Sequence, residues 1–129
     1  MKEDQLLSLS KRERQIMDVV YMLGEATAAD IHEHLPEKAG EDSIRKLIRV
    51  VEAKGYLTHR REGPRYVYQP TIPSDVASQY ALRHTLKTFF RGSAPRVVSA
   101  LLALKEGELS EDEIAEILAL IRQAKERGE

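Results

Sequence analysis

The stretch DSIRKLIRVVEAKG, residues 42–55, combines an apolar stripe with a basic face. Its aliphatic residues recur at the i, i+3, i+4, i+7 spacing of a helix with one buried side: Ile44, Leu47, Ile48 and Val51. The opposite direction carries Lys46 and Arg49, with Arg45 at its edge, and Gly55 suits a left-handed helix end. The segment therefore predicts one helix with an apolar back and a basic front.

Two capping boxes predict the helices that precede this stretch. Ser10 and Glu13 in SKRE begin the first helix, because the serine side chain and the glutamate can each satisfy the other's backbone N–H. This helix carries the apolar stripe Ile16, Val19, Val20 and Leu23. Gly24 ends it. Thr27 with Asp30 begins a short second helix that Pro36 ends. Residues 42–55 are thus the third consecutive helix.

The segment after residue 55 changes its period from helical to alternating. YLTHRR and RYVYQ are short runs rich in aromatic and β-branched residues, and EGP between them predicts a hairpin turn. We expect Tyr66 and Tyr68 to pack on the helices beneath. Three helices and a two-stranded ribbon within about 70 residues predict a winged helix-turn-helix domain, mainly α with a small β-hairpin.

The remaining part of the chain predicts three further helices, the last opened by the capping box SEDE at residues 110–113. We divide the chain into a winged-helix DNA-binding domain, residues 1–72, and a three-helix dimerisation region, residues 73–129. These helices are too few and too elongated to close a core alone, so we expect a second copy of the chain to cover them. The expected dimerisation residues are Val76, Tyr80, Phe89, Phe90, Val98, Leu101, Leu102, Ile114, Ile117, Leu118 and Ile121.

Composition narrows the class of protein. The 129 residues include no cysteine, which excludes disulfides, thiolate metal sites and a cysteine nucleophile. No run of about 18 apolar residues offers a membrane span, and the charged N-terminus lacks the apolar core of a signal peptide, so we expect a cytoplasmic protein with no membrane partner. The net charge is −1, but the charges are unevenly distributed along the chain. Residues 41–70 hold seven bases and four acids, and residues 106–116 hold six acids and no base.

The basic front of the third helix has the chemistry of DNA recognition. The major groove admits one α-helix, and Arg or Lys can pair with guanine O6 and N7 at its floor. The candidates on this helix are Ser43, Arg45, Lys46 and Arg49, and those on the hairpin, where a wing would lie along the phosphate backbone, are Arg60, Arg61 and Arg65. The alternatives are a solvated basic face on an ordinary helix and protective charge on an exposed edge strand.

The sequence contains none of the motifs that would predict an enzyme. A glycine-rich phosphate loop, a G-x-S-x-G elbow and an H-E-x-x-H pair are all absent. His32 and His34 would point about 200° apart on a helix and cannot chelate one ion together. We read the acids of residues 106–116 as a solvated helix start rather than a cation site. We therefore expect no catalytic residue, no metal and no cofactor.

Two segments together resemble the penicillinase-repressor family of bacterial transcription factors, the BlaI/MecI type. They are LSKRERQIMDVVYMLGEATAADI and SIRKLIRVVEAKGYLTHRREGPRYVYQP. The resemblance implies a homodimer that binds a pseudo-palindromic operator in double-stranded DNA and blocks transcription. It also implies that the four candidates of the third helix form the reading face and that the three arginines form the wing. The chain departs from the family pattern at Val50, Glu52 and Ala53, so the operator sequence does not follow from it.

The resemblance does not identify an inducer. Antibiotic-responsive members of the family are cut at an Asn-Phe bond in the dimerisation helices, and the corresponding place here reads Leu102-Ala103. Copper-responsive relatives carry a C-terminal cysteine cluster, which this chain lacks. Two other functions fit the sequence: a protein-interaction module whose acidic residues 106–116 meet a basic partner, and a ligand-sensing regulator with a pocket between the wing domain and the tail.

Overall fold

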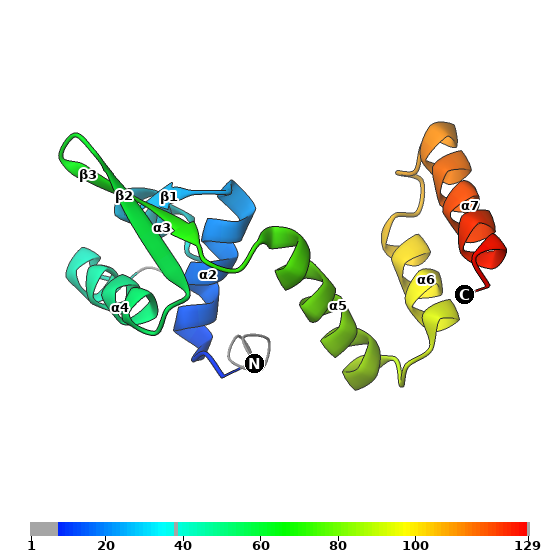
Figure 1. Cartoon of the computed structure of the whole chain (residues 1–129), viewed down its shortest axis with the longest axis horizontal. Coiled ribbons are helices and arrows are strands. Elements are labelled where there is room, and N and C mark those ends of the chain that lie inside the picture. The colour runs from blue at the N-terminus through cyan, green and yellow to red at the C-terminus, as the bar shows by residue number, and fades with distance from the viewer. Residues whose placement is uncertain (1–7, 38, 129) are drawn as a thin grey trace. The chain divides into compact units, whose positions relative to one another are not determined.

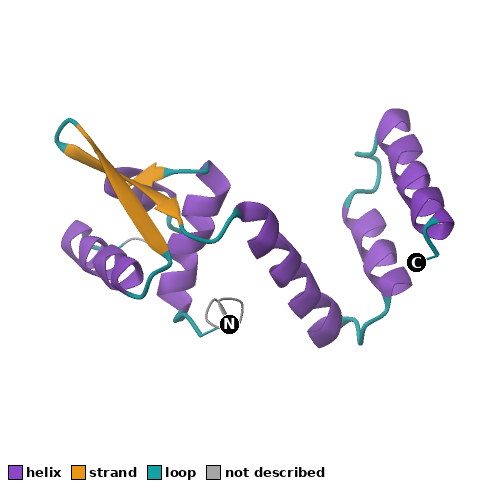
Figure 2. Cartoon of the chain, in the orientation of Figure 1, coloured by secondary structure: helices purple, strands orange, loops and turns teal. Residues whose placement is uncertain are grey.

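The computed structural model describes residues 8–37 and 39–128, so residues 1–7 of the predicted first domain lie outside the described residues. Within these ranges six helices and three strands are assigned (Figure 1). In chain order they are α2 (Lys11–Leu23), β1 (Ala26–Thr27), α3 (Ala28–His34), α4 (Glu41–Ala53), β2 (Leu57–Glu62), β3 (Arg65–Pro70), α5 (Ser74–Phe89), α6 (Ala94–Leu104) and α7 (Glu111–Glu126). Figure 2 shows that helices predominate over a small antiparallel sheet, which confirms the predicted fold class.

All three predicted capping boxes form. At the start of α2 the Glu13 N–H donates to Ser10 Oγ at 3.2 Å, and the Ser10 N–H donates to Glu13 Oε1 at 2.9 Å. The same reciprocal pair joins Thr27 and Asp30 at α3, and Ser110 and Glu113 at α7. Each box satisfies two backbone donors that the first helical turn leaves without partners, which fixes where these helices begin.

The sheet contains one strand more than the sequence predicted. Its strand order is β1-β3-β2, and both pairings are antiparallel. In β1, Ala26 lies opposite Tyr68 and Thr27 opposite Val67. The predicted two-stranded hairpin is confirmed as β2 and β3. The strand β1 was missed because it has only two residues, too few to show an alternating pattern.

The core lies among α2, α3, α4 and the sheet. Its fully buried side chains include Ile16, Val20, Ile31, Ile44, Ile48 and Val51. Leu47 is half-buried and packs against this core. Leu23 does not join the stripe of α2 as expected, since it is the last residue of the helix and 41% of it is exposed. Met17 is buried instead.

The chain divides into two compact units, Met1–Leu82 and Arg83–Glu129. The first unit includes the beginning of α5, where Ala77 packs against the core and Tyr80 is buried. In the second unit no described residue is buried, and Phe89 and Leu104 are 74% and 79% exposed. No helix within the described residues is both long enough and apolar enough for a membrane span.

Candidate nucleic-acid interface

The structure brings the four predicted residues of α4 to the solvent side of that helix. Ile44, Ile48 and Val51 are buried in the core. Ser43, Arg45, Lys46 and Arg49 are exposed. Within the described ranges none of the three bases forms an ion pair. Their charge is therefore available to a partner of the protein.

An ion pair holds the C-terminal end of α4. Lys54 Nζ donates to both carboxylate oxygens of Glu13, at 3.0 and 2.9 Å, and so ties the end of α4 to the first turn of α2. Only 4% of Glu13 is exposed. Hydrogen bonds from Ser10 and Lys54 lower the pKa of the Glu13 carboxyl, because they stabilise its charged form. Sequence reasoning identified Glu13 only as a capping residue and missed this contact.

The register of the hairpin separates its neighbouring arginines. Arg61 lies opposite Tyr66 and Arg60 opposite Val67, so the two side chains project from opposite faces of the ribbon. His59, opposite Tyr68, shares the face of Arg61. Arg61 therefore lies on the face of the wing that carries the tyrosines, whereas Arg60 lies on the other.

The three wing arginines also differ in their partners. Arg60 Nη2 donates to the carboxylates of both Glu25 and Glu62, and these hydrogen bonds raise the pKa of its guanidinium. In the described part of the chain, Arg61 and Arg65 form no ion pair. From the sequence we expected the same role, contact with the phosphate backbone, for all three arginines. In the structure two carboxylates compensate the charge of Arg60.

Side-chain contacts connect the wing to α4. His59 Nδ1 pairs with Glu52 Oε2 on α4, and the His59 ring stacks on Tyr66 with 4.2 Å between centroids. Tyr68 is buried as expected, and burial raises the pKa of its hydroxyl. Tyr66 differs from the expectation, because 45% of it is exposed. This aromatic cluster fixes the base of the wing beside α4.

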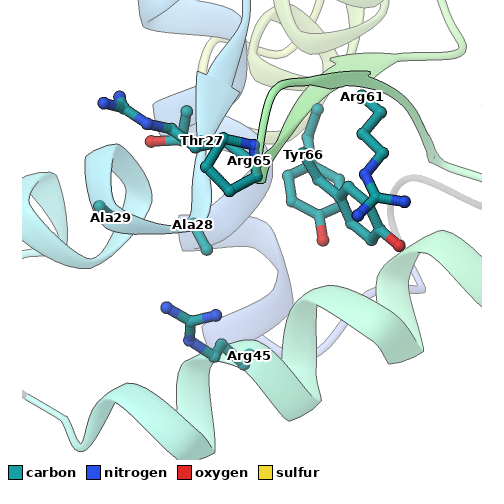
Figure 3. Close-up of a pocket in the computed structure, with 9 residues that line it drawn as sticks. Thr27, Ala28, Ala29, Arg45, Arg61, Arg65 and Tyr66 are labelled. Carbon is teal, nitrogen blue, oxygen red and sulfur yellow. The ribbon is translucent and has the colours of Figure 1, made fainter.

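A hollow of about 330 Å³, here named the wing pocket, opens between the start of α3, α4 and the hairpin (Figure 3). Its lining consists of Thr27, Ala28, Ala29, Arg45, Arg61, Pro64, Arg65, Tyr66 and Tyr68. Figure 3 shows Arg45 pointing from α4 toward Ala28, and Arg61 descending from the wing beside the ring of Tyr66. The lining thus contains three arginines and no carboxylate.

The two histidines of α3 contact backbone carbonyl oxygens. His32 Nε2 lies 2.8 Å from the Ala39 carbonyl oxygen, and His34 Nδ1 lies 2.9 Å from that of Asp30. Among the residues that the structure describes, no group of three or more His, Asp or Glu side chains could hold a metal ion. Both imidazoles instead contact backbone carbonyls close to α3.

The predicted dimerisation residues are mostly on the surface of the single chain. Tyr80 is the buried one among the eleven, with 9% exposed. The other ten are half-buried or exposed, namely Val76, Phe89, Phe90, Val98, Leu101, Leu102, Ile114, Ile117, Leu118 and Ile121. Neither α6 nor α7 buries any residue.

Comparison with known proteins finds both a family and a relative. The family model described as "Penicillinase repressor" matches residues 9–123. The chain is also 26% identical over 115 residues to an "uncharacterized 16.5 kDa protein in ptsI 3′ region" of Latilactobacillus sakei, an alignment that covers 88% of this chain and 77% of that protein.

A solved structure of a Staphylococcus aureus MepR mutant has a similar fold. A glutamine-to-proline mutant of MepR from a multidrug-resistant clinical isolate aligns with a TM-score of 0.51 at 16% identity, covering 99% of this chain and 87% of that one. MepR itself, described as a transcription regulator of the multidrug efflux pump MepA, gives 0.48 at 15% identity, covering 99% and 88%. At this identity the mutant's structure supports the fold alone.

Proposed function

The chain belongs to the penicillinase repressor family of winged-helix transcriptional regulators, and we propose that it represses transcription as a homodimer on a pseudo-palindromic operator. The family consists of DNA-binding repressors and not of enzymes. Repression of this kind requires neither a cofactor nor catalysis. A repressor of this kind acts in the cytoplasm, where it meets its operator DNA.

The observation that carries the proposal is the unpaired basic surface of α4 beside the wing. A helix whose exposed side presents Lys46 and Arg49 can enter the major groove while its buried aliphatic side stays in the core. Arg61 and Arg65 on the adjoining hairpin can then meet backbone phosphates. Arg60 contributes less in this arrangement, since Glu25 and Glu62 already neutralise its charge.

The homodimer accounts for the apolar surface of the second unit. Helices α6 and α7 bury no side chain within one chain. Their apolar residues Leu101, Leu118 and Ile121 are each about half exposed. A helix pair with this much apolar surface is stabilised when a second copy covers it. Two copies would present two α4 helices about 34 to 36 Å apart, or a multiple of that spacing, to two half-sites one or more DNA turns apart.

Footprinting on the DNA upstream of the protein's own gene, followed by mobility-shift titration, tests the proposal. The protected sequence and a scrambled duplex of equal length and composition are titrated in parallel. We expect the protected sequence to bind at least about a thousandfold more tightly, the lower end for specific recognition. Equal affinity for the two duplexes would contradict sequence-specific repression.

Salt dependence separates this function from a protein-interaction module. Arginines that neutralise phosphates release counterions, so DNA affinity should fall steeply between about 50 and 200 mM salt. A DNA affinity that hardly changes over this range would show that the arginines of α4 and the wing do not contact phosphates.

A further inference from the structure

The wing pocket has a lining that suits a particular class of ligand. Arg45 comes from α4, and Arg61 and Arg65 come from the two strands of the hairpin. The rest of the lining is largely apolar or aromatic, with Ala28, Ala29, Pro64 and the two tyrosines Tyr66 and Tyr68. Arg65 lies opposite Glu62, so its side chain leaves the other face of the ribbon from Arg61 and the tyrosines. The hollow thus offers the guanidinium groups of Arg45 and Arg61 and a flat apolar wall.

The positive charge of the pocket is not compensated from within it. No carboxylate belongs to its lining. The nearby Asp30 already accepts hydrogen bonds from Thr27, which together with the weaker influence of Arg65 lower the pKa of its carboxyl. Asp30 is therefore engaged in capping α3, and an anion in the pocket would supply the missing negative charge.

We propose that the wing pocket binds a small organic anion with a flat apolar body, such as an aromatic carboxylate, and that this anion and DNA exclude each other. The inference rests on the proposed function for its regulatory consequence, and on the pocket alone for the binding itself. The carboxylate accepts from Arg45 and Arg61, whose planar forks match two oxygens at once. The ring lies against the tyrosine and alanine wall.

The volume favours a molecule over an isolated phosphate group. About 330 Å³ lies within the range of roughly 300 to 1,000 Å³ that is usual for small-molecule sites. A phosphate of the DNA backbone could nevertheless use the same guanidinium groups, because it presents the same oxyanion chemistry. Inorganic phosphate and an aromatic carboxylate are therefore compared as probes.

Mutual exclusion follows from shared residues. Arg45, Arg61 and Arg65 line the pocket and are also the residues proposed to meet DNA. An anion held by Arg45 and Arg61 neutralises charge that phosphates would otherwise neutralise, so the apparent dissociation constant for DNA should rise by the factor 1 + [anion]/Kd of the anion. Such competition releases DNA without cutting the chain.

The first experiment measures binding to the full chain without DNA, by amide shifts in 1H–15N NMR spectra. Benzoate is the probe, benzamide is its neutral counterpart of similar shape, and inorganic phosphate is an anion without an apolar body. We expect benzoate to saturate shifts at Ala29, Arg61 and Tyr66, and the other two compounds to bind at least about tenfold more weakly. Phosphate that binds as tightly as benzoate would overturn the organic-anion assignment.

Two variants locate the site. Ala29→Leu fills the hollow at an exposed helical position, and Arg61→Gln removes one guanidinium. Each should weaken benzoate binding about tenfold while the melting temperature in circular dichroism stays near that of the wild type. Should Ala29→Leu fail to fold, Arg61→Gln decides the result alone. Unchanged benzoate affinity in the folded variants would contradict the proposed site.

The second experiment measures DNA affinity in the presence of benzoate, with chloride replaced so that the ionic strength is constant. Benzoate should weaken DNA binding by the stated factor in the wild type and much less in Ala29→Leu, and benzamide should have no effect. An equal effect of benzoate on both proteins would refute competition at the pocket. A protein that binds no DNA even without benzoate would instead contradict the proposed function, and the NMR result would still test the pocket.

Discussion

Lys54 and Glu13, which are 41 residues apart in the chain, form an ion pair that connects α4 to α2. The lysine side chain is 47% exposed, whereas the glutamate side chain is almost fully buried, with 6% exposed. Glu13 also accepts from the Ser10 N–H, so one carboxylate both begins α2 and holds the end of α4. The orientation of the basic surface of α4 thus depends on a residue that lies outside it.

Loss of the lysine should destabilise the fold. Lys54→Met leaves the Glu13 carboxylate buried with only its capping bonds, which should reduce the free energy of unfolding by about 1 to 3 kcal/mol. Urea denaturation measures this. Lys46→Met on the exposed side of the same helix is the matched control and should change the free energy of unfolding by less than about 0.5 kcal/mol. Similar effects of both substitutions would show that the ion pair contributes nothing.

Acid should remove the same stabilisation. The pKa of Glu13 in the folded protein lies below its ordinary value of 4.5, mainly through the Ser10 N–H and then Lys54. Its contribution is therefore complete above 4.5 and is lost as the pH falls through the folded pKa. Glu13→Gln should flatten the decline in stability between about pH 5 and pH 2. Urea denaturation across this range measures how the free energy of unfolding falls with pH. Glu113 is also a capping residue but is exposed, so Glu113→Gln should leave most of the decline in place.

Arg49 should contribute to sequence recognition. It lies on the exposed side of α4, and Arg49→Ala should cost about 1 to 3 kcal/mol of binding to the operator if its guanidinium pairs with a base. Binding to a scrambled duplex should change far less. Fluorescence anisotropy with both duplexes distinguishes this from a phosphate contact, for which both affinities would fall together.

The two neighbouring arginines of β2 provide a matched pair. Arg61→Ala should weaken binding to all sequences alike and reduce the slope of log affinity against log salt by about one. Arg60→Ala should reduce this slope less, since Glu25 and Glu62 hold the Arg60 side chain on the opposite face of the ribbon. Titrations at several salt concentrations measure both slopes, and a larger loss for Arg60→Ala would reverse our assignment.

The second unit should associate through its apolar faces. Sedimentation equilibrium should give about twice the chain mass of 14.6 kDa for the wild type. Leu118→Glu in α7 should shift the protein toward the monomer, because it buries a charge in the proposed interface. Met22→Glu changes an exposed apolar residue of the first unit and should leave the mass unchanged. A monomeric wild type would argue against the homodimer.

The sequence predicts those features that depend on neighbouring residues. The apolar back of α4 and all three capping boxes follow from spacings of three or four residues, and the structure has them. The contact of Arg60 with Glu25 does not follow in this way. Glu25 lies 35 residues away, and only the register of the sheet decides which face of the ribbon Arg60 occupies.

The wing pocket illustrates the same limit for the candidate site. Its lining comes from the β1 and α3 region, from α4 and from the hairpin, and β1 was too short to predict. The sequence indicated the three arginines as separate contacts to DNA. It held no signal that they surround one hollow together with the start of α3.

Because α6 and α7 bury no side chain in a single chain, a repressor that acts as the proposed homodimer would be active in an amount that depends on the concentration of its chains. Where most chains are single, the concentration of pairs varies as the square of the total. Halving the concentration of the chain would then lower the concentration of pairs about fourfold. Growth rate and gene dosage would thereby set how firmly the target genes are kept silent.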